Sequence, residues 1–393
     1  MKKTFMSLVE LTVLTMVFTQ IASAALTNRY VIKNNAGSAV PYDSQVNAAS
    51  NIQIAIDYAK NSETVLVYAA TYDAGGIANW PAGALLTNRV AITKAITVMS
   101  VSNDPANTII KGAWDPATTN GPAAIRCVYM AAGSTLVGFT LTNGATEAYN
   151  IGYGGGMYAK DRTVIVSNCV ITGNSAGRYG AGTYNGTFYN CTIIGNLIWS
   201  QGTGGGAYNG TLYNCLIAKN SGVGTHSSTN YNCLIIGNYL GYWGGGAYLS
   251  TLYNCTIVGN KSSDLGGGTY GSTLYNCIIY SNTGAVGSLN YYSNCILTNC
   301  CTTPTNSAWV SGDGNITNNP MFVASGAGFG TNLVAGNYHL SGSSPCINAG
   351  TNGAWTTNYA GYVDLDGRPR VRYGRVDIGC YEYVSKGAII SIR

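Results

Sequence analysis

Short apolar runs alternate with asparagine and glycine through the middle of the chain, from Val164 to Cys300. Each unit contains Tyr-Asn-Cys or Ser-Asn-Cys, usually with an aliphatic residue two positions after the cysteine. Seven cysteines mark these units at steps of 18 to 24 residues: Cys169, Cys191, Cys215, Cys233, Cys255, Cys277 and Cys295. A period of this length predicts a solenoid, because one coil cannot bury its apolar side alone and neighbouring coils must stack.

The units predict strands rather than helices. Their apolar runs are short and β-type, and no unit has room for a helix of about ten residues. Asn and Gly tolerate a left-handed backbone, which a sharp bend between two strands requires. The sequence therefore predicts an all-β chain, a single-stranded parallel β-helix whose like residues stack about 4.8 Å apart. We expect Leu252, Cys255 and Ile257 to point inward. Tyr253 should point outward, and Asn254 should form the bend.

The first 24 residues have the pattern of a secretory signal. Lys2 and Lys3 precede an apolar stretch at 6–18, and the residues up to Ala24 suit cleavage after Ala24. No other apolar segment reaches the roughly 20 residues that a helix needs to span a bilayer. We therefore expect an exported protein, extracellular or at the cell surface, with no transmembrane span in the mature chain.

Asparagine and cysteine recur at fixed positions and should form columns along the solenoid. Stacked asparagine side chains can hydrogen-bond from coil to coil, and six asparagines follow the cysteines by five positions: Asn174, Asn196, Asn220, Asn238, Asn260 and Asn282. Twelve cysteines in an exported chain normally indicate a disulfide framework, but side chains stacked in one column have parallel vectors. We expect mostly free buried thiols in the column. Better disulfide candidates are Cys300 with Cys301, and Cys346 with Cys380.

Less regular segments flank the repeat. Ser50 is the expected N-cap of a short amphipathic helix over Ile52–Ala59, which suits the exposed end of a solenoid. In the early coils, Phe139 takes the slot that cysteine occupies later. The expected divisions are a signal peptide at 1–24, an N-terminal cap and first coil at 25–90, the β-helix at 91–340 with regular repeats at 163–300, a closing module at 341–383 and a tail at 384–393.

The N-terminal segment resembles secreted bacterial β-helix proteins of the pectin-lyase-like class. The resemblance rests on the capping helix, the strand at 64–68 and the turn at Thr71-Tyr72, and it spans most of residues 30–383. It implies a right-handed parallel β-helix but no particular activity, because that fold hosts many functions. The Gly-Gly-Gly-Ala-Tyr units are also similar to the repeats of chlamydial polymorphic outer membrane proteins, which favours a surface or adhesive role.

The C-terminal residues resemble the choice-of-anchor module of bacterial surface β-helix proteins. The resemblance rests on segments 344–350, 364–370 and 376–383, and implies polar module positions at Asp364, Asp366, Arg368, Arg370, Asp377 and Glu382. Asp364 and Asp366 suggest a calcium loop, but further ligands are missing, so we expect a salt-bridged end cap. Residues 384–393 carry no hydrophobic tail or sorting motif, which leaves both secretion and surface attachment open.

Charged groups are scarce, which limits the chemistry that the coils can carry. Only 9% of residues are charged, the formal net charge is +5, and no Lys/Arg run suggests nucleic-acid binding. Across 163–300 the only carboxylate is Asp264 and the only histidine is His226. A glycoside hydrolase needs two carboxylates within roughly 5–9.5 Å. A polysaccharide lyase or hydrolase would therefore have to use four loop residues: Lys160, Asp161, Arg162 and Arg178. We expect these four and His226 to be solvated loop side chains, and assign no catalytic, metal or cofactor site.

The outward tyrosines of the repeat are the candidate binding residues. They should form a column on which successive sugars of an extended glycan stack, with hydroxyls supplying hydrogen bonds: Tyr189, Tyr213, Tyr231, Tyr253 and Tyr275. The alternative is a ladder that stacks only on itself and stabilises adjacent strands. The sequence favours an exported, non-catalytic scaffold or adhesin that binds polysaccharide or cell-surface glycan. A polysaccharide-active enzyme and a structural envelope protein without ligand are the alternatives.

Overall fold

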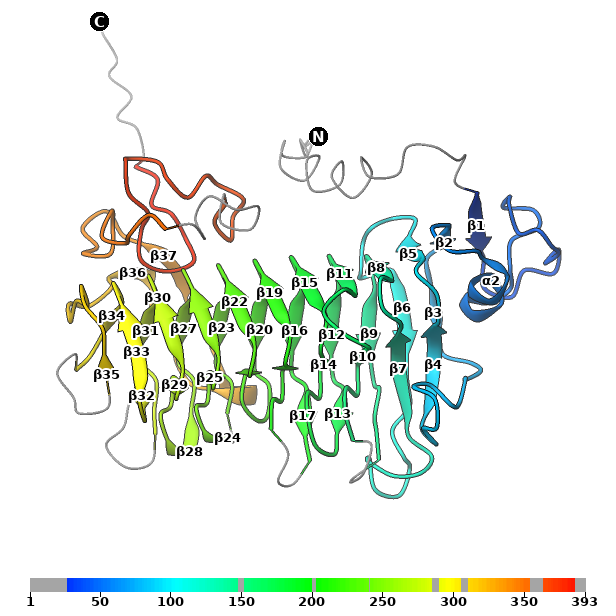
Figure 1. Cartoon of the computed structure of the whole chain (residues 1–393), viewed down its shortest axis with the longest axis horizontal. Helices are drawn as coiled ribbons and strands as arrows, with labels where there is room; N and C mark the ends of the chain where they lie inside the picture. The colour runs from blue at the N-terminus through cyan, green and yellow to red at the C-terminus, as the bar shows by residue number, and fades with distance from the viewer. Residues whose placement is uncertain are drawn as a thin grey trace, which may run out of the picture.

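The computed structural model describes residues 27–147, 152–199, 203–239, 241–284, 290–304, 310–353 and 363–385. These residues form a right-handed parallel β-helix whose axis follows the longest dimension of the molecule (Figure 1). The expected fold class is confirmed. The expected signal peptide at 1–24 and residues 386–393 of the tail lie outside the described residues.

Each regular coil contributes one strand to each of three parallel sheets. Sheet A contains β1 (Asn28–Val31), β2 (Thr64–Val67), β5 (Thr97–Ser100), β8 (Thr135–Val137), β11 (Ile165–Ser167), β15 (Thr187–Tyr189), β19 (Thr211–Tyr213), β22 (Thr229–Tyr231), β26 (Thr251–Tyr253), β30 (Thr273–Tyr275), β33 (Cys295–Thr298) and β35 (Val310–Ser311). Sheet B contains β3 (Ala70–Tyr72), β6 (Thr108–Lys111), β9 (Thr140–Thr142), β12 (Val170–Thr172), β16 (Thr192–Ile194), β20 (Leu216–Ala218), β23 (Leu234–Ile236), β27 (Thr256–Val258), β31 (Ile278–Tyr280) and β34 (Cys301–Thr302). Sheet C contains β4 (Thr87–Ile92), β7 (Ile125–Met130), β10 (Met157–Ala159), β14 (Thr183–Tyr184), β18 (Ala207–Tyr208), β21 (Thr225–His226), β25 (Ala247–Tyr248), β29 (Thr269–Tyr270) and β32 (Tyr291–Tyr292).

Three two-stranded pairs lie outside these sheets. Two of them are parallel and join neighbouring coils: β13 (Ser175–Ala176) with β17 (Leu197–Ile198), and β24 (Gly241–Trp243) with β28 (Ser262–Leu265). The third is antiparallel and belongs to the C-terminal segment, β36 (Phe322–Ala324) with β37 (Asn337–Leu340), and the short 3-10 helix η1 (Gly330–Asn332) lies between its strands.

The repeat has the predicted inward and outward positions. Leu252, Cys255 and Ile257 are fully buried, whereas Tyr253 is only half-buried because strand neighbours alternate between faces. Asn254 forms the bend between sheets A and B with a φ of 51°, in the left-handed region that asparagine tolerates. The prediction for this unit is confirmed.

A column of buried asparagines lines the bend that follows sheet B. Asn220 illustrates the pattern: its Nδ2 donates to Asn238 Oδ1 at 2.8 Å in the next coil. Its Oδ1 accepts from both the backbone N and the Nδ2 of Asn196, each at 3.0 Å. The same bonds link the six asparagines from Asn174 to Asn282. The predicted coil-to-coil hydrogen bonding is confirmed.

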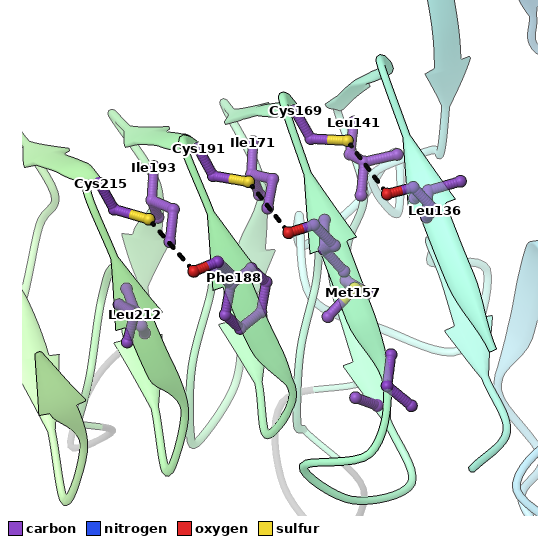
Figure 2. Close-up of a cluster of buried hydrophobic side chains, with 14 of the residues drawn as sticks. Leu136, Leu141, Met157, Cys169, Ile171, Phe188, Cys191, Ile193, Leu212 and Cys215 are labelled. Atoms are coloured by element: carbon purple, nitrogen blue, oxygen red, sulfur yellow. Dashed lines mark hydrogen bonds between the residues drawn. The ribbon is translucent and has the colours of Figure 1, made fainter. Parts of the chain in front are cut away.

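The cysteine column consists of free buried thiols, as predicted. Figure 2 shows Cys169, Cys191 and Cys215 in line, each with its Sγ directed at a carbonyl oxygen of the preceding coil. Each Sγ also contacts the carbonyl two residues earlier in its own coil, as in Cys215 Sγ to Tyr213 O at 3.3 Å. Desolvation raises the pKa of Cys169, so this thiol stays protonated at neutral pH.

The two disulfide predictions are wrong, because all twelve cysteines have free thiols. Cys300 lies in the inward column, and Cys301, the next residue, faces the other way from the strand. Cys346 packs in the apolar cluster that contains Cys301, while Cys380 packs in a different cluster with Leu333. Neither expected pair therefore forms a disulfide bond.

The last regular unit also differs from the expected one. Strand β33 pairs with β30 so that Ile296 lies beside Thr273 and Thr298 beside Tyr275. Cys300 therefore follows Cys277 in the column and accepts its backbone N–H at 3.4 Å. Cys295, which the Ser-Asn-Cys pattern placed there, belongs to sheet A instead. The spacing was ambiguous because two Asn-Cys pairs, at 294–295 and 299–300, occur within seven residues at this point.

The N-terminal end of the solenoid is covered by α2 (Ile52–Tyr58), seen at the end of the coils in Figure 1. Its N-cap is Asn51 and not Ser50, because the Asn51 Oδ1 accepts the Ile54 N–H at 3.0 Å. Ile52 and Ile56 are buried against the first coils, as predicted. Phe139 does occupy the cysteine slot: it is buried and its N–H donates to Cys169 Sγ.

The C-terminal segment packs against the side of the last coils. Leu333, Tyr338 and Cys380 cover outward residues of sheet B such as Ile236 and Val258. Hydrogen bonds join the segment to bend asparagines, from Asn232 Nδ2 to Val363 O at 2.8 Å and from Asn276 Nδ2 to Thr351 O at 2.9 Å. Among the described residues, these contacts of the segment are made with sheet B and with the bends that follow sheet A.

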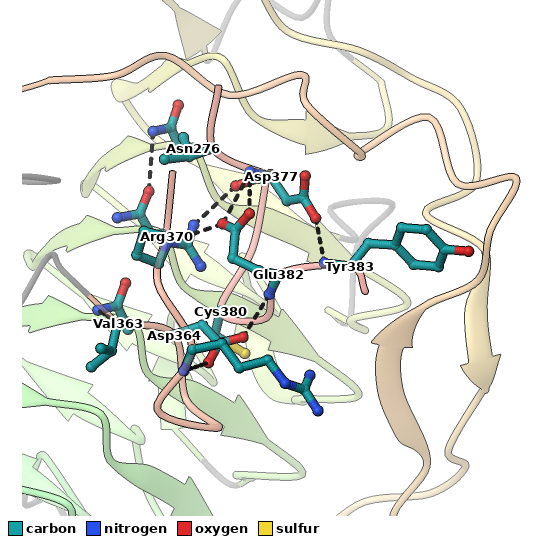
Figure 3. Close-up of polar contacts among 12 residues, drawn as sticks. Asn276, Val363, Asp364, Arg370, Asp377, Cys380, Glu382 and Tyr383 are labelled. Atoms are coloured by element: carbon teal, nitrogen blue, oxygen red, sulfur yellow. Dashed lines mark hydrogen bonds and ion pairs between the residues drawn. The ribbon is translucent and has the colours of Figure 1, made fainter. Parts of the chain in front are cut away.

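A buried ionic cluster holds this segment together (Figure 3). Arg370 lies among three carboxylates, Asp364, Asp377 and Glu382, and all four side chains are almost fully buried. Arg370 Nε lies 3.2 Å from Glu382 Oε1. The Asp364 carboxylate accepts the backbone N–H groups of Asp366, Arg368 and Glu382. The expected ion pairing is present. The carboxylates of Asp364 and Asp366, which suggested a calcium loop, accept hydrogen bonds from groups of this chain.

We expect the C-terminal segment to loosen as the pH rises. Burial raises the pKa of Glu382 to about 8, and burial also raises the pKa of Asp364 and Asp377. In the unfolded chain these groups ionise near pH 4, so the folded state binds more protons between those values. The stabilisation that these buried acids provide is therefore fully present below about pH 4, and the contribution of Glu382 is lost as the pH rises through about 8. Limited proteolysis of the segment from pH 5 to 9 should show this, and Glu382→Gln should flatten the dependence; an unchanged slope in that variant would contradict it.

Candidate functional site

The predicted tyrosines form one stacked row on the outer face of sheet A. Consecutive ring centroids lie 4.9, 4.8, 4.9 and 5.1 Å apart, with interplanar angles of 7 to 12°, for Tyr189, Tyr213, Tyr231, Tyr253 and Tyr275. The row exists because these residues pair without a register shift from strand to strand. We call it the sheet A tyrosine row.

Ring stacking determines what this row can offer to a ligand. The faces of each inner ring are largely covered by its two neighbours, so a ligand can contact only the ring edges and the hydroxyls. Burial raises the pKa of four of the phenols, which keeps their hydroxyls protonated at neutral pH: Tyr189, Tyr213, Tyr231 and Tyr253. A glycan would contact this row through hydrogen bonds to hydroxyls rather than by stacking on ring faces.

A second aromatic row runs along sheet C, and sequence analysis did not assign it a role. Its members are Tyr129, Tyr158, Tyr184, Tyr208, His226, Tyr248, Tyr270 and Tyr292, which we call the sheet C aromatic row. The sequence did contain its signal, because four of these tyrosines lie seven residues before a repeat cysteine. The parallel register of sheet C then places them in one line.

Two tyrosines from the adjoining turns widen this row in its first half. Tyr153 stacks on Tyr179 at 5.5 Å and on Tyr184 at 5.1 Å. The Arg178 guanidinium lies 5.2 Å from the Tyr179 ring, at the exposed side. The buried Arg126 lies 5.2 Å from the Tyr158 ring and donates to the carbonyls of neighbouring residues. The first half of the row is therefore densely packed.

His226 belongs to the sheet C aromatic row and is not a solvated loop residue, contrary to the prediction. It lies in β21, it is buried, and its Nδ1 is 2.8 Å from Thr203 Oγ1. Desolvation lowers its pKa to about 4, so the ring is neutral at neutral pH. Its T-shaped contacts with Tyr208 and Tyr248 give it a packing role within the row.

The alternative catalytic cluster is only partly brought together. Lys160, Asp161 and Arg162 line an open hollow with Asn185 and Asn209. Arg162 is held there, because its guanidinium donates to the backbone and side-chain oxygens of Asn209 at 3.1 and 2.8 Å. Arg178, the fourth expected member, lies against Tyr179 and does not line the hollow.

Within the described ranges, no group of three or more His, Cys, Asp or Glu side chains is placed to hold a metal ion. No helix in that part of the chain is long and apolar enough to cross a membrane.

Comparison with known proteins supports the fold. No protein-family model matches the sequence, and no curated protein matches it significantly. Among solved structures, the chain is similar to the pectate lyase Pel9A, with 15% identity, a TM-score of 0.58, and coverage of 91% of this chain and 97% of that one. It is also similar to a rhamnogalacturonan lyase, with 13% identity, a TM-score of 0.41, and coverage of 74% and 87%. The similarity to the pectate lyase confirms the expected β-helix fold, and at this identity it establishes the fold alone.

Proposed function

We propose that this protein is an exported, non-catalytic β-helix scaffold that binds polysaccharide along its coils. The observation that carries the proposal is the pair of aromatic rows on sheets A and C, which repeat one side chain per coil at rung spacing. Side chains repeated in this way suit a ligand that is itself an extended repeat, because each coil can present the same group to the next sugar.

Three further observations support the parts of this proposal. The signal-like N-terminus favours export, and the resemblance of residues 344–383 to a choice-of-anchor module favours the cell surface. The single carboxylate between residues 163 and 300 argues against a glycoside hydrolase site in the regular coils. The fold of the chain is compatible with binding and with cleavage, so it does not decide between them.

The proposal is tested by mixing the purified residues 25–393 with insoluble and soluble polysaccharides, both acidic and neutral. We expect pull-down with at least one of them. We expect no rise in absorbance near 235 nm and no new reducing ends. Cleavage of any polymer would contradict the non-catalytic role and direct attention to Lys160, Arg162 and Arg178. If no polymer were retained or cleaved, a structural envelope role would be the better account.

A paired substitution tests the sheet A tyrosine row within this assay. Tyr213→Phe with Tyr253→Phe removes two hydroxyls but keeps the stacked rings, and we expect polysaccharide retention to fall several-fold because the row binds through hydroxyls. Tyr213→Ala with Tyr253→Ala should abolish retention on this row and also lower thermal stability, because cross-strand aromatic pairs contribute about 0.5–1 kcal/mol each. Unchanged retention in both variants would remove this row from the proposed binding surface.

A further inference from the structure

The sheet C aromatic row changes its geometry halfway along the solenoid. From Tyr158 through Tyr184 to Tyr208 the rings stack in nearly parallel planes, with interplanar angles of 17 and 4°. From His226 onward the angles open: 67° between His226 and Tyr248, and 53° between Tyr248 and Tyr270. The rings in this half therefore do not form one continuous parallel stack, and Tyr248 and Tyr270 stay partly exposed.

A tryptophan from a separate strand pair completes this tilted section. Trp243 lies on β24, which pairs with β28 through an irregular register between Gly241 and Trp243. Its ring centroid is 6.0 Å from Tyr248 and 5.9 Å from Tyr270, at angles of 32 and 36°. Trp243 is 43% exposed and the adjacent Tyr242 is 61% exposed. The β24–β28 pair therefore adds one large exposed aromatic side chain, Trp243, beside the tilted rings, with the exposed Tyr242 next to it in sequence.

Surfaces without a binding partner rarely expose tryptophan and tyrosine side chains in one patch. Large exposed aromatic groups in a contiguous patch mark interaction sites, since leaving them in water forgoes the free energy of burying them. Trp and Tyr are the side chains that dominate binding energy, because they combine large apolar faces with few rotatable bonds. The C–H faces of pyranose sugars are flat apolar surfaces of matching size.

The charges around the cluster restrict the kind of glycan. Between residues 220 and 300 the only charged residues are Lys261 and Asp264. Lys261 is committed elsewhere, with its Nζ 4.5 Å from the Phe329 ring of the C-terminal segment. Asp264 lies on β28, the strand paired with Trp243. Since His226 is neutral at neutral pH, it adds no positive charge to the cluster. A polyuronate would therefore find no free cation among residues 220–300 to pair with its carboxylates, because Lys261 lies against Phe329.

We propose that Trp243, Tyr248 and Tyr270, with Tyr242 at the edge, form the sugar-stacking site of this protein and that the ligand is an uncharged polysaccharide of pyranose sugars. This inference rests on the proposed function and adds to it the position of the tightest contact and the class of polymer. The nearly parallel half of the row serves to hold the coils in register, and the tilted half makes the contact with the glycan.

The inference is tested by titration calorimetry of the residues 25–393 with cellohexaose, xylohexaose, mannohexaose and hexagalacturonate. We expect at least one neutral hexasaccharide to bind and hexagalacturonate not to bind. Trp243→Ala should lower the affinity for the neutral hexasaccharide at least tenfold. Trp243→Phe should lower it less, because an aromatic ring remains. The matched control is Trp114→Ala, since Trp114 is equally exposed (42%) but lies in a loop of the early coils. The control should keep the wild-type affinity.

Thermal unfolding of each variant separates loss of binding from loss of fold. Trp243→Ala should melt within a few degrees of the wild type, because the side chain lies on the surface. Binding of hexagalacturonate in preference to the neutral sugars would overturn the proposed polymer class. A neutral hexasaccharide bound equally by wild type and Trp243→Ala would overturn the proposed site while leaving the proposed function intact. If the wild type bound no hexasaccharide and retained no polysaccharide, the proposed function itself would fail.

Discussion

Replacing Asn220 by alanine should lower the free energy of unfolding by about 4 kcal/mol. The Asn220 side chain is fully buried and makes four hydrogen bonds that span three coils. Alanine would leave the Ile193 carbonyl and the Asn196 N–H and Nδ2 groups without these partners in a space that excludes water. Each buried polar group without a partner costs about 1–3 kcal/mol, and the three losses fall in one place.

Chemical denaturation monitored by far-UV circular dichroism measures this effect. Asn61→Ala is the matched control, because Asn61 is exposed in a turn before β2 and its loss should change the free energy of unfolding by less than about 0.5 kcal/mol. Asn220→Asp is a second useful variant, since aspartate keeps the shape but cannot donate to Ile193 and Asn238 when ionised. A loss for Asn220→Ala no larger than that for Asn61→Ala would show that the column does not stabilise the coils.

Replacing Gly246 by alanine should destabilise the protein by about 3 kcal/mol. A Cβ at this position would lie 2.6 Å from Gly268 O, 2.7 Å from Ile257 Cγ2 and 3.0 Å from Asn260 Nδ2. The first is backbone of the next coil, held by sheet hydrogen bonds, and the last belongs to the asparagine column. Neither can move without disturbing its own partners, and forcing an extra methyl into such packing typically costs about 1–3 kcal/mol or more.

The matched control for this substitution is Gly210→Ala. A Cβ at Gly210 would meet the ends of Leu212 and Phe188 at 3.3 Å, and these flexible side chains can adjust. We expect the loss of stability at Gly210 to be less than half of the loss at Gly246, measured by the same denaturation. Equal losses would mean that the close approach to the next coil is not what the glycine provides.

The same contact explains the glycine-rich turns of the repeat. The last glycine of the turn approaches the next coil and the asparagine column in several units: Gly182, Gly206, Gly224, Gly246 and Gly268. The turn thus has a packing function in addition to its conformational one. This close approach depends on the distance between coils, which a sequence pattern does not contain.

The inside of the solenoid was determined by the sequence alone. Leu252, Cys255 and Ile257 occupy fixed positions in a short unit, and a repeated unit can bury them only by stacking on its own copies. The same logic required the bend at Asn254, since the chain must turn sharply between two strands with a residue that tolerates a left-handed backbone. Local chemistry repeated at a constant period therefore predicted the fold.

The tertiary structure decided the features that depend on which groups meet across the surface. Cys346 packs in the cluster of Cys301 and not in that of its expected partner Cys380, because the C-terminal segment folds along sheet B and that path is not encoded in any repeat. Ring orientation was likewise outside the reach of sequence analysis. Tyrosines stack on one another in the sheet A tyrosine row, whereas Tyr248 and Tyr270 are tilted and also contact Trp243, which the separate strand pair β24–β28 brings beside them. The repeat period of the sequence determines which side chains align along the solenoid. The neighbouring segments in the folded chain determine how these side chains pack and which of them stay exposed.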